Sequence, residues 1–205
     1  PNGIDVKDVE LAAKADLPEA LKTLFEGPTV VAVGRLNQQK GFDHLIHAHK
    51  RARQMGVNFN LVIVGAGDEL SALDGLSKEL DVSESVHLVG FQENPHRFMS
   101  KATIFVSSSR FEGFGLVIAE ALACKAPVIA YDCPSGPAEI LGQGRYGVLV
   151  PPQDIEALAH EIVSLLADPT RRASLSANGP SRAKNFDIDA FRDSWAEVIK
   201  AAVRS

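Results

Sequence analysis

The chain has little of what marks disulfide-bonded, metal-clustered or membrane-spanning proteins. Its 205 residues include two cysteines, Cys124 and Cys133, which provide neither a disulfide framework nor a zinc cluster. A reduced, cytosolic setting is the default for such a chain. No apolar run reaches about 18 residues and no signal peptide is recognisable, so the sequence predicts no transmembrane segment. Because it begins at Pro1 without a methionine, we expect an excised fragment of a longer protein.

Charge and catalytic motifs are also sparse. The formal net charge of −5 gives no electrostatic footprint for general nucleic-acid binding, so any phosphate site must be local. The sequence contains no Gly-x-Ser-x-Gly elbow, Walker loop or paired CxxC. The motif from Asp187 to Asp189 is expected to cap a helix rather than bind a metal. The histidines His44, His47 and His49 are expected to be core or surface residues, so we expect no metal site.

What the sequence does contain is a β-loop-α pattern repeated along its length. Short apolar runs alternate with amphipathic segments, which predicts a parallel sheet covered by helices. We therefore expect an α/β, Rossmann-like, doubly wound parallel sheet of about six strands with helices on both faces and a helical C-terminal tail. The expected strands are residues 29–33, 60–64, 86–91, 103–107, 127–131 and 147–150.

The expected helices lie before the first strand, between successive strands and after the last strand. They are residues 16–25, 42–55, 68–80, 94–101, a central helix from about 113, then 135–141, 154–167, 170–184 and 187–203. We expect one Rossmann-like domain over residues 1–205, with a linker and N-terminal helix at 1–27, a βα core at 28–153 and C-terminal helices at 154–205. The glycine-rich and polar loops follow the strands, where ligands bind in such sheets.

The stretch that organises the chain runs from residue 107 to residue 125. Gly113 and Gly115 lie where a helix should begin, and the unpaired N–H groups of a first helical turn bind anions. Glu112 and Glu120 are eight positions apart, which spans roughly 12 Å on a helix. The helix is apolar nearly all round, so we expect Glu120 to be buried and hydrogen-bonded. Glu120 is then either a structural acid or a ligand for ribose hydroxyls, and Glu112 either complements the helix dipole or contacts a ligand.

Two further loops carry candidate ligand groups. Arg35 and Lys40 flank the loop after the first strand, where they either clamp a diphosphate or are solvated surface charges. Gly65 and Gly67 begin a dinucleotide fingerprint whose third glycine is replaced by Leu70. We therefore predict no nicotinamide site, and explain both glycines by close approach to a ligand or by a tight βα turn.

Taken together, these motifs resemble a known family over nearly the whole chain. The carriers are Gly34-Arg-Leu with Lys40-Gly-Phe, Val64-Gly-Ala-Gly, Val89-Gly-Phe, Ser108-Ser-Arg-Phe-Glu-Gly-Phe-Gly-Leu-Val-Ile-Ala-Glu-Ala, Pro127-Val-Ile-Ala, Gly136-Pro-Ala-Glu-Ile and Gly147-Val-Leu-Val. The chain resembles the C-terminal, donor-binding half of retaining glycosyltransferases of the GT-B fold, in family 4 (glycosyl transferases group 1).

The resemblance implies a role for each matching residue. Arg35 and Lys40 would bind the donor diphosphate, and Glu120 would take the ribose hydroxyls. Glu112 would be the catalytic residue, facing the transferred sugar or the reaction centre. The base would be bound near Phe91 and Gln92. The remaining donor-binding residues implied are Gly34, Gly65, Gly67, Gly113, Phe114, Gly115, Leu116 and Val117. No metal and no cofactor is implied, because Arg, Lys and the helix start would stabilise the leaving diphosphate.

The reaction implied is transfer of a hexosyl group from a nucleotide sugar to an acceptor with retained configuration, UDP being the first expectation and GDP the second. The resemblance implies a second half that binds the acceptor, a sugar or lipid-linked glycan, and we expect that half to be missing from this chain. We therefore expect this chain to bind nucleotide and to transfer sugar poorly or not at all alone. We expect a cytoplasmic protein, attached to the inner face of a membrane, if at all, through the missing half. The alternatives are a non-catalytic nucleotide-binding domain, an NAD-dependent oxidoreductase, which the broken fingerprint disfavours, and an epimerase or phosphorylase.

Overall fold

The computed structural model describes residues 3–189 and residue 192. One six-stranded, wholly parallel sheet runs through this part of the chain, in the order β3-β2-β1-β4-β5-β6. Both the sheet and its parallel pairing confirm the predicted fold class. The strands are β1 (Thr29–Val33), β2 (Asn60–Val64), β3 (Val86–Leu88), β4 (Ile104–Ser107), β5 (Val128–Tyr131) and β6 (Val148–Val150).

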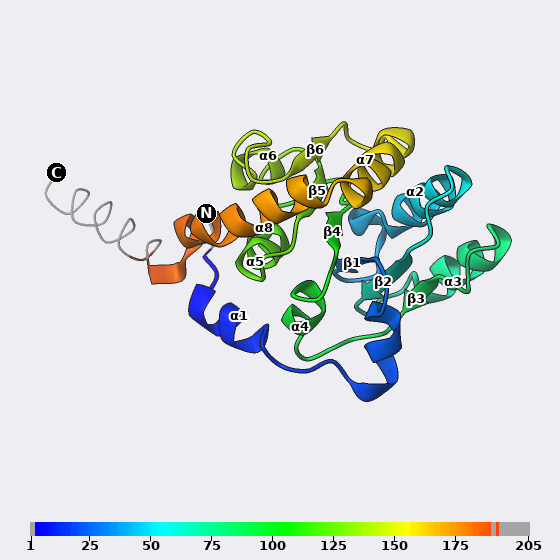
Figure 1. The fold of residues 1–205 in the computed structure, drawn as a ribbon, viewed down its shortest axis with the longest axis horizontal. Coiled ribbons are helices and arrows are strands. Elements are labelled where there is room, and N and C mark those ends of the chain that lie inside the picture. The colour runs from blue at the N-terminus through cyan, green and yellow to red at the C-terminus, as the bar shows by residue number, and fades with distance from the viewer. Residues whose placement is uncertain (1–2, 190–191, 193–205) are drawn as a thin grey trace, which may run out of the picture.

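Helices follow the strands on both faces of the sheet (Figure 1). The α-helices are α1 (Val6–Ala12), α2 (Phe42–Gln54), α3 (Leu70–Glu79), α4 (His96–Met99), α5 (Leu116–Ala123), α6 (Pro137–Ile140), α7 (Ile155–Ala167) and α8 (Pro169–Ala183). Within the described residues there are also three 3₁₀ helices: η1 (Glu19–Phe25), η2 (Gln38–Lys40) and η3 (Lys184–Phe186).

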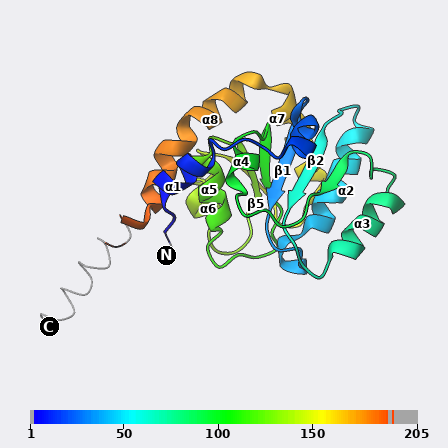
Figure 2. The same ribbon diagram turned by 90° about the horizontal axis from the view of Figure 1, so that it is seen from below.

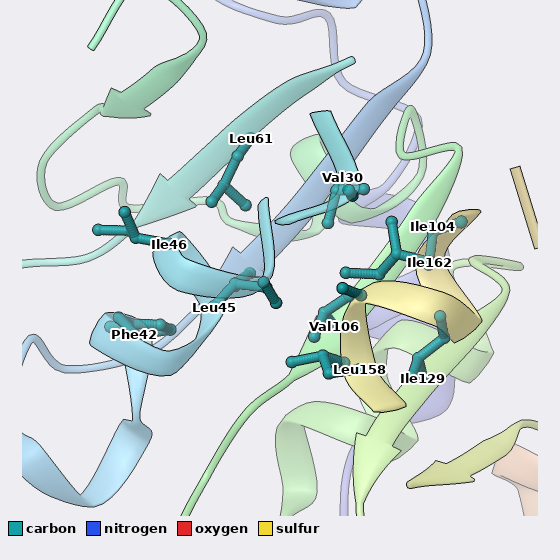
Figure 3. Packing of buried hydrophobic residues seen from close by; sticks show 14 of the residues in the cluster. Val30, Phe42, Leu45, Ile46, Leu61, Ile104, Val106, Ile129, Leu158 and Ile162 are labelled. Carbon is teal, nitrogen blue, oxygen red and sulfur yellow. The ribbon is translucent and has the colours of Figure 1, made fainter. Parts of the chain in front are cut away.

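Alternation along the strands divides the core into two layers, since successive strand side chains point to opposite faces. In β1, Val30 and Ala32 pack on one face and Val31 on the other. The first face is covered by α2, α3 and α7. Figure 3 shows apolar side chains of α2 and α7 packed with those of the strands. The second is covered by α1, α4, α5 and α8. Figure 2 shows β1 and β2 lying between α4 and α2, as this division requires.

Several predicted boundaries are wrong at their ends. The third strand stops at Leu88 rather than at residue 91, because Gly90 with φ +73° turns the backbone away. Helix α4 covers four residues rather than the predicted eight. Helix α1 was not predicted; Asp5 caps it by accepting a hydrogen bond from the Asp8 N–H.

Helix α8 lies directly across α5 on the second face of the sheet. A Cβ atom at Gly179 would lie 2.9 Å from the Leu122 carbonyl oxygen, so glycine allows the two helix backbones to approach closely. The bridge between Ile4 and Asp187 holds the N-terminal segment beside the end of α8 and η3. Beyond Asp189, only Arg192 of the helix expected at 187–203 belongs to the described residues.

Candidate functional site

The strand order places the topological switch point of the sheet between β1 and β4, and we call the region outside the carboxyl ends of these two strands the crevice. Crossovers run outward from these two central strands in opposite directions, and ligands bind in doubly wound sheets at this switch point. Residues 34–41 follow β1, and residues 108–115 follow β4. The two loops therefore meet at the carboxyl edge of the sheet although they are far apart in sequence.

Lys40 and Glu112 form the central contact of this crevice. Lys40 Nζ donates to Glu112 Oε1 at 2.6 Å, and the Ser109 hydroxyl donates to the same oxygen at 2.6 Å. The two charged side chains are 18% and 7% exposed. A carboxylate so well buried needs such partners, because unpaired it would lose its hydration without compensation. The Lys40 stem passes close to Gly34, where a Cβ atom would lie 3.2 Å from Lys40 Cε.

A cavity of about 300 Å³ opens at the ends of β1 and β2. The Phe91 ring stands 75% exposed at its edge. Gln92 is held in place, donating to the Val89 carbonyl oxygen and accepting from Arg97. Arg35 is exposed and makes no ion pair within the described part of the chain. The cavity thus brings together several predicted donor-binding residues, its full lining being Val33, Gly34, Arg35, Val64, Gly65, Ala66, Phe91, Gln92 and Pro95.

Gly65 and Gly67 are explained by backbone packing. A Cβ atom at Gly65 would lie 1.8 Å from the Gly34 carbonyl oxygen, and one at Gly67 would lie 2.3 Å from the Leu36 carbonyl oxygen. Gly65 also has φ +150°, a conformation that favours glycine. Of the two explanations left open by the sequence, these contacts support a tight βα turn packed against the loop after β1.

Helix α5 begins later than the glycines suggest. Gly115 is its N-cap with φ +86°, so Gly113 lies in the preceding loop and the first-turn amides belong to Leu116 and Val117. Leu116, Val117 and Glu120 form a partly exposed stripe, whereas the rest of α5 is buried. The expectation that Glu120 is buried is therefore wrong, because its side chain is 26% exposed. The helix is apolar in composition but is not covered all round.

Glu120 lines a cavity of about 430 Å³ between α1 and the start of α4. Its Oε2 lies 3.7 Å from His96 Nε2, which is longer than a hydrogen bond. The carboxylate is thus neither in bulk solvent nor locked by a short internal salt link. His96 lines this cavity and Pro95 lines the 300 Å³ cavity, so the two hollows adjoin along the start of α4.

Phe114 points away from the crevice. Its ring packs against Phe186 with centroids 5.7 Å apart, in the hydrophobic layer on the second face. A Cβ atom at Gly136 would lie 1.7 Å from the Phe114 carbonyl oxygen. The loop after β5 therefore packs directly against the backbone of the loop between β4 and α5. Any contact of Phe114 with a ligand in the crevice is therefore made by its backbone.

The structure adds residues that the sequence analysis did not select. Ser109 and Arg110 lie within the motif around Glu112, and that proximity was the available signal. Cys133 follows β5 close to the crevice. Burial, with the neighbouring Glu112 charge, raises the pKa of the Cys133 thiol, which outweighs the opposite effect of Lys40. The thiol is therefore protonated near neutral pH and is unsuited to act as a nucleophile.

A larger cavity, of about 600 Å³, lies at the opposite edge of the sheet. Lys14 and Lys125 line it, just after α1 and α5, where a cation complements the C-terminal end of a helix dipole. Cys124 also lines it, and burial raises the pKa of this thiol to about 12. None of the predicted site residues lies here, so its size does not make it the functional site.

Metal and membrane features are absent from the described residues. Residues 3–189 and 192 contain no group of three or more His, Cys, Asp or Glu side chains able to hold a metal ion. Asp187 Oδ1 accepts a hydrogen bond from the Asp189 N–H at 2.9 Å, as a capping residue does. No helix in the same part of the chain is long and apolar enough to cross a bilayer.

Comparison with known proteins identifies relatives of this arrangement. The chain is 35% identical over 186 residues to an N-acetylgalactosaminyltransferase of Campylobacter jejuni that acts on a diphospho-undecaprenol glycan, covering 91% of this chain and 48% of that protein. Sucrose-phosphate synthase of Thermosynechococcus elongatus superposes with a TM-score of 0.82 at 29% identity, covering 100% and 52%. HepE of Anabaena, solved with UDP, shares the fold with a TM-score of 0.84 at 24% identity, covering 97% and 56%.

The chain thus spans about half the length of the relatives it matches. The sequence profile of glycosyl transferases group 1 matches residues 15–182, which includes both loops of the crevice and the stripe on α5. The chain belongs to the glycosyl transferases group 1 family and has the fold of the C-terminal domain of a GT-B glycosyltransferase.

Proposed function

We propose that this chain binds a nucleotide-diphospho-sugar, with UDP as its nucleotide, and presents the glycosyl group for transfer to an acceptor. The Lys40–Glu112 pair at the switch point carries the proposal, because it places a cation and an acid side by side next to the free amides of α5. HepE was solved with UDP, which supports UDP over GDP. The acceptor, a sugar or lipid-linked glycan, would be bound by a partner domain of the longer protein.

Each part of the ligand then has a counterpart in the crevice. The base would lie in the 300 Å³ cavity near Phe91 and Gln92, and the ribose hydroxyls would face Glu120. The diphosphate would meet Lys40, Arg35 and the amides of the first turn of α5, which donate to anions without a metal ion. The sugar would lie beside Glu112.

The chemistry proposed is a same-face transfer that retains the anomeric configuration. The acceptor oxygen forms a bond to the anomeric carbon while the bond from that carbon to the β-phosphate oxygen breaks. The acceptor proton passes to the leaving phosphate, and Lys40 with the helix start stabilises the charge that develops there. Glu112 has two hydrogen-bond partners of its own and is not poised as a covalent nucleophile.

The experiment is a calorimetric titration of the 205-residue chain with UDP, GDP, UDP-sugars and NAD, with and without EDTA. We expect binding of UDP and a UDP-sugar in the presence of EDTA, and no binding of NAD. Failure to bind any nucleoside diphosphate would contradict the proposal. Transfer is tested on the longer protein by NMR of the product, where an inverted anomeric configuration would exclude the same-face route.

One observation favours a second candidate, a nucleotide-binding domain without chemistry. Glu112 already has a structural task, since it accepts hydrogen bonds from Lys40 and Ser109. Turnover of the longer protein carrying Glu112→Ala separates the two functions. A loss of transfer with the fold retained supports catalysis, whereas unchanged transfer supports binding alone.

A further inference from the structure

A dense seam of hydrogen bonds joins the two loops of the crevice. The Arg110 N–H donates to the Gln39 carbonyl oxygen, and Gln39 Nε2 donates back to the Phe111 carbonyl oxygen. The Ser108 hydroxyl donates to the Lys40 carbonyl oxygen at 2.9 Å. At Gly41 a Cβ atom would lie 2.2 Å from the Ser108 carbonyl oxygen. The seam fixes where the loop carrying Glu112 lies relative to Lys40.

The Arg110 guanidinium lies at the centre of this seam and turns toward α2. It donates to the Gln38 carbonyl oxygen at 2.5 Å, to Asp43 Oδ2 at 2.6 Å and to His44 Nε2 at 2.9 Å. Arginine has donors only, so His44 Nε2 must be the unprotonated ring nitrogen and His44 must be neutral in this arrangement. Three acceptors from one turn and one helix thus converge on a single side chain of the opposite loop.

We propose that Arg110 is a positioning residue that locks the loop carrying Glu112 onto the turn carrying Lys40, with His44 Nε2 as an acceptor the lock requires. The proposal rests on the function proposed above, because it explains how Lys40 and Glu112 keep their positions relative to each other. Arg110 itself does not touch the ligand.

The competing role for Arg110 is that of a third cation for the donor diphosphate. Its surroundings argue against that role. Asp43 already neutralises the guanidinium, and this hydrogen bond raises the pKa of Arg110. Arg110 also lines a cavity of about 780 Å³ together with the acids Asp43, Glu69 and Glu79, which would repel a phosphate. The Arg110 guanidinium therefore makes its hydrogen bonds to the protein itself, on the side of the loop that faces these acids.

The acceptor role of His44 makes the lock sensitive to acid. Burial lowers the pKa of His44, and the charges of Arg110 and His47 lower it further, against the opposite effect of Asp43. Protonation would place a donor against the guanidinium and break the bond. Four titratable groups face His44: Asp43 and His47 on α2, Arg110 on the loop after β4, and Tyr131 on β5. Two more charges lie farther out, Glu69 near Arg110 and Asp154 near Tyr131.

The first test needs no ligand and measures hydrogen exchange of the residue-110 amide, which donates across the seam. Hydrogen bonds to charged groups change an opening equilibrium about 10- to 100-fold. We expect exchange to be faster by that factor in Arg110→Gln, with a smaller increase in Arg110→Lys, whose single ammonium cannot reach all three acceptors. Arg51→Gln, which breaks the exposed pair with Glu156, is the control and should leave this amide unchanged.

The second test uses His44. His44→Gln places an amide oxygen near the former Nε2, and this side chain cannot be protonated. We therefore expect the residue-110 amide of His44→Gln to exchange at the wild-type rate at pH 7.5. Below about pH 6.5, exchange in this variant should not accelerate relative to the intrinsic rate. His44→Leu should exchange faster at every pH, and the wild type should move toward it on acidification. His160→Gln, on the exposed side of α7, is the matched control. Equal acid sensitivity of the wild type and His44→Gln would overturn the role of His44.

The third test is UDP binding to the same variants at pH 7.5. We expect about tenfold weaker binding to Arg110→Gln and wild-type binding to His44→Gln. Weaker UDP binding without faster exchange would mean that Arg110 contacts the phosphate, which overturns the proposal. If the wild type binds no nucleoside diphosphate, the proposed function fails, while the exchange data still decide whether the lock exists. Should Arg110→Gln not fold, His44→Leu provides the same readout with the Asp43 pair intact.

Discussion

Replacing Glu112 with glutamine should strengthen nucleotide binding while it weakens sugar transfer. The Glu112 carboxylate lies 2.6 Å from Lys40 Nζ and neutralises this cation. A diphosphate that approaches Lys40 must share this cation with the carboxylate and is repelled by it. Glu112→Gln keeps an acceptor for Lys40 and Ser109 but removes the charge. The gain in binding and the loss in turnover have opposite signs, which a purely structural acid would not produce.

The size of the effect follows from the burial of the pair. The repulsion that matters is the one between the Glu112 carboxylate and a phosphate bound at Lys40. Two unit charges about 6 Å apart interact by roughly 0.7 kcal/mol in water and by about 3 kcal/mol at an effective dielectric constant near 20. With Glu112 7% and Lys40 18% exposed, the site lies between these limits. A relief of about 1–2 kcal/mol corresponds to roughly 5- to 30-fold tighter binding of UDP.

The assay is a calorimetric titration of the chain with UDP at low ionic strength, followed by turnover of the longer protein. Lys40→Met should weaken UDP binding, and by more in the Glu112→Gln background, because the released lysine is fully available to the phosphate. Glu156→Gln removes an exposed acid from the Arg51 pair and should leave UDP binding unchanged. UDP affinity that is unchanged or lower in Glu112→Gln would refute the reasoning.

The remaining predictions concern stability and ribose recognition. Burial lowers the pKa of His49 to about 3, so the unfolded chain gains a proton as pH falls below about 6.5 while the folded chain does not. Denaturant titrations should therefore show about 2 kcal/mol less stability at pH 5 than at pH 7.5 from this group, and His49→Gln should lack that part of the loss. Gly136→Ala should destabilise the fold, because the new Cβ would meet the Phe114 carbonyl oxygen at φ +107°. Gly75→Ala, in open space within α3, should instead stabilise by about 0.5–1 kcal/mol in thermal unfolding. Glu120→Gln should reduce the preference for UDP over 2′-deoxy-UDP about tenfold, and an unchanged preference would exclude Glu120 from ribose binding.

The sheet could be predicted because parallel strands are buried on both faces. Residues 30–33 and 61–64 are continuous apolar runs that each follow one polar strand residue, Thr29 or Asn60, and end at a glycine. The structure places both in the sheet. Helix ends were less accessible, since they depend on caps and on tertiary contacts. Helix α1 was missed because it has only seven residues and is stabilised by packing on α4 and α5. Its N-cap, Asp5, was the local signal that could have indicated it.

Composition alone could not predict the exposure of α5. Its residues are apolar apart from Glu120, which suggested burial on all sides. The structure covers α5 with the sheet, α1 and α8 but leaves the stripe of Leu116, Val117 and Glu120 partly open. Which stripe of a uniformly apolar helix is left uncovered depends on its neighbours rather than on its own sequence. Here the open stripe coincides with the residues that the family resemblance assigned to the donor.

The roles of the basic residues show most clearly what a sequence leaves undetermined. Arg35, Lys40 and Arg110 all lie in loops at the carboxyl edge, and by residue type each suits a phosphate. Their partners distinguish them, since Lys40 faces Glu112 across the crevice, whereas Arg110 turns away to Asp43. Those partners are 72 and 67 positions distant along the chain, and only the β1–β4 switch point brings them together. A cation's role in this fold is therefore set by the acid that the topology places beside it, which is why Arg110 became apparent only in three dimensions.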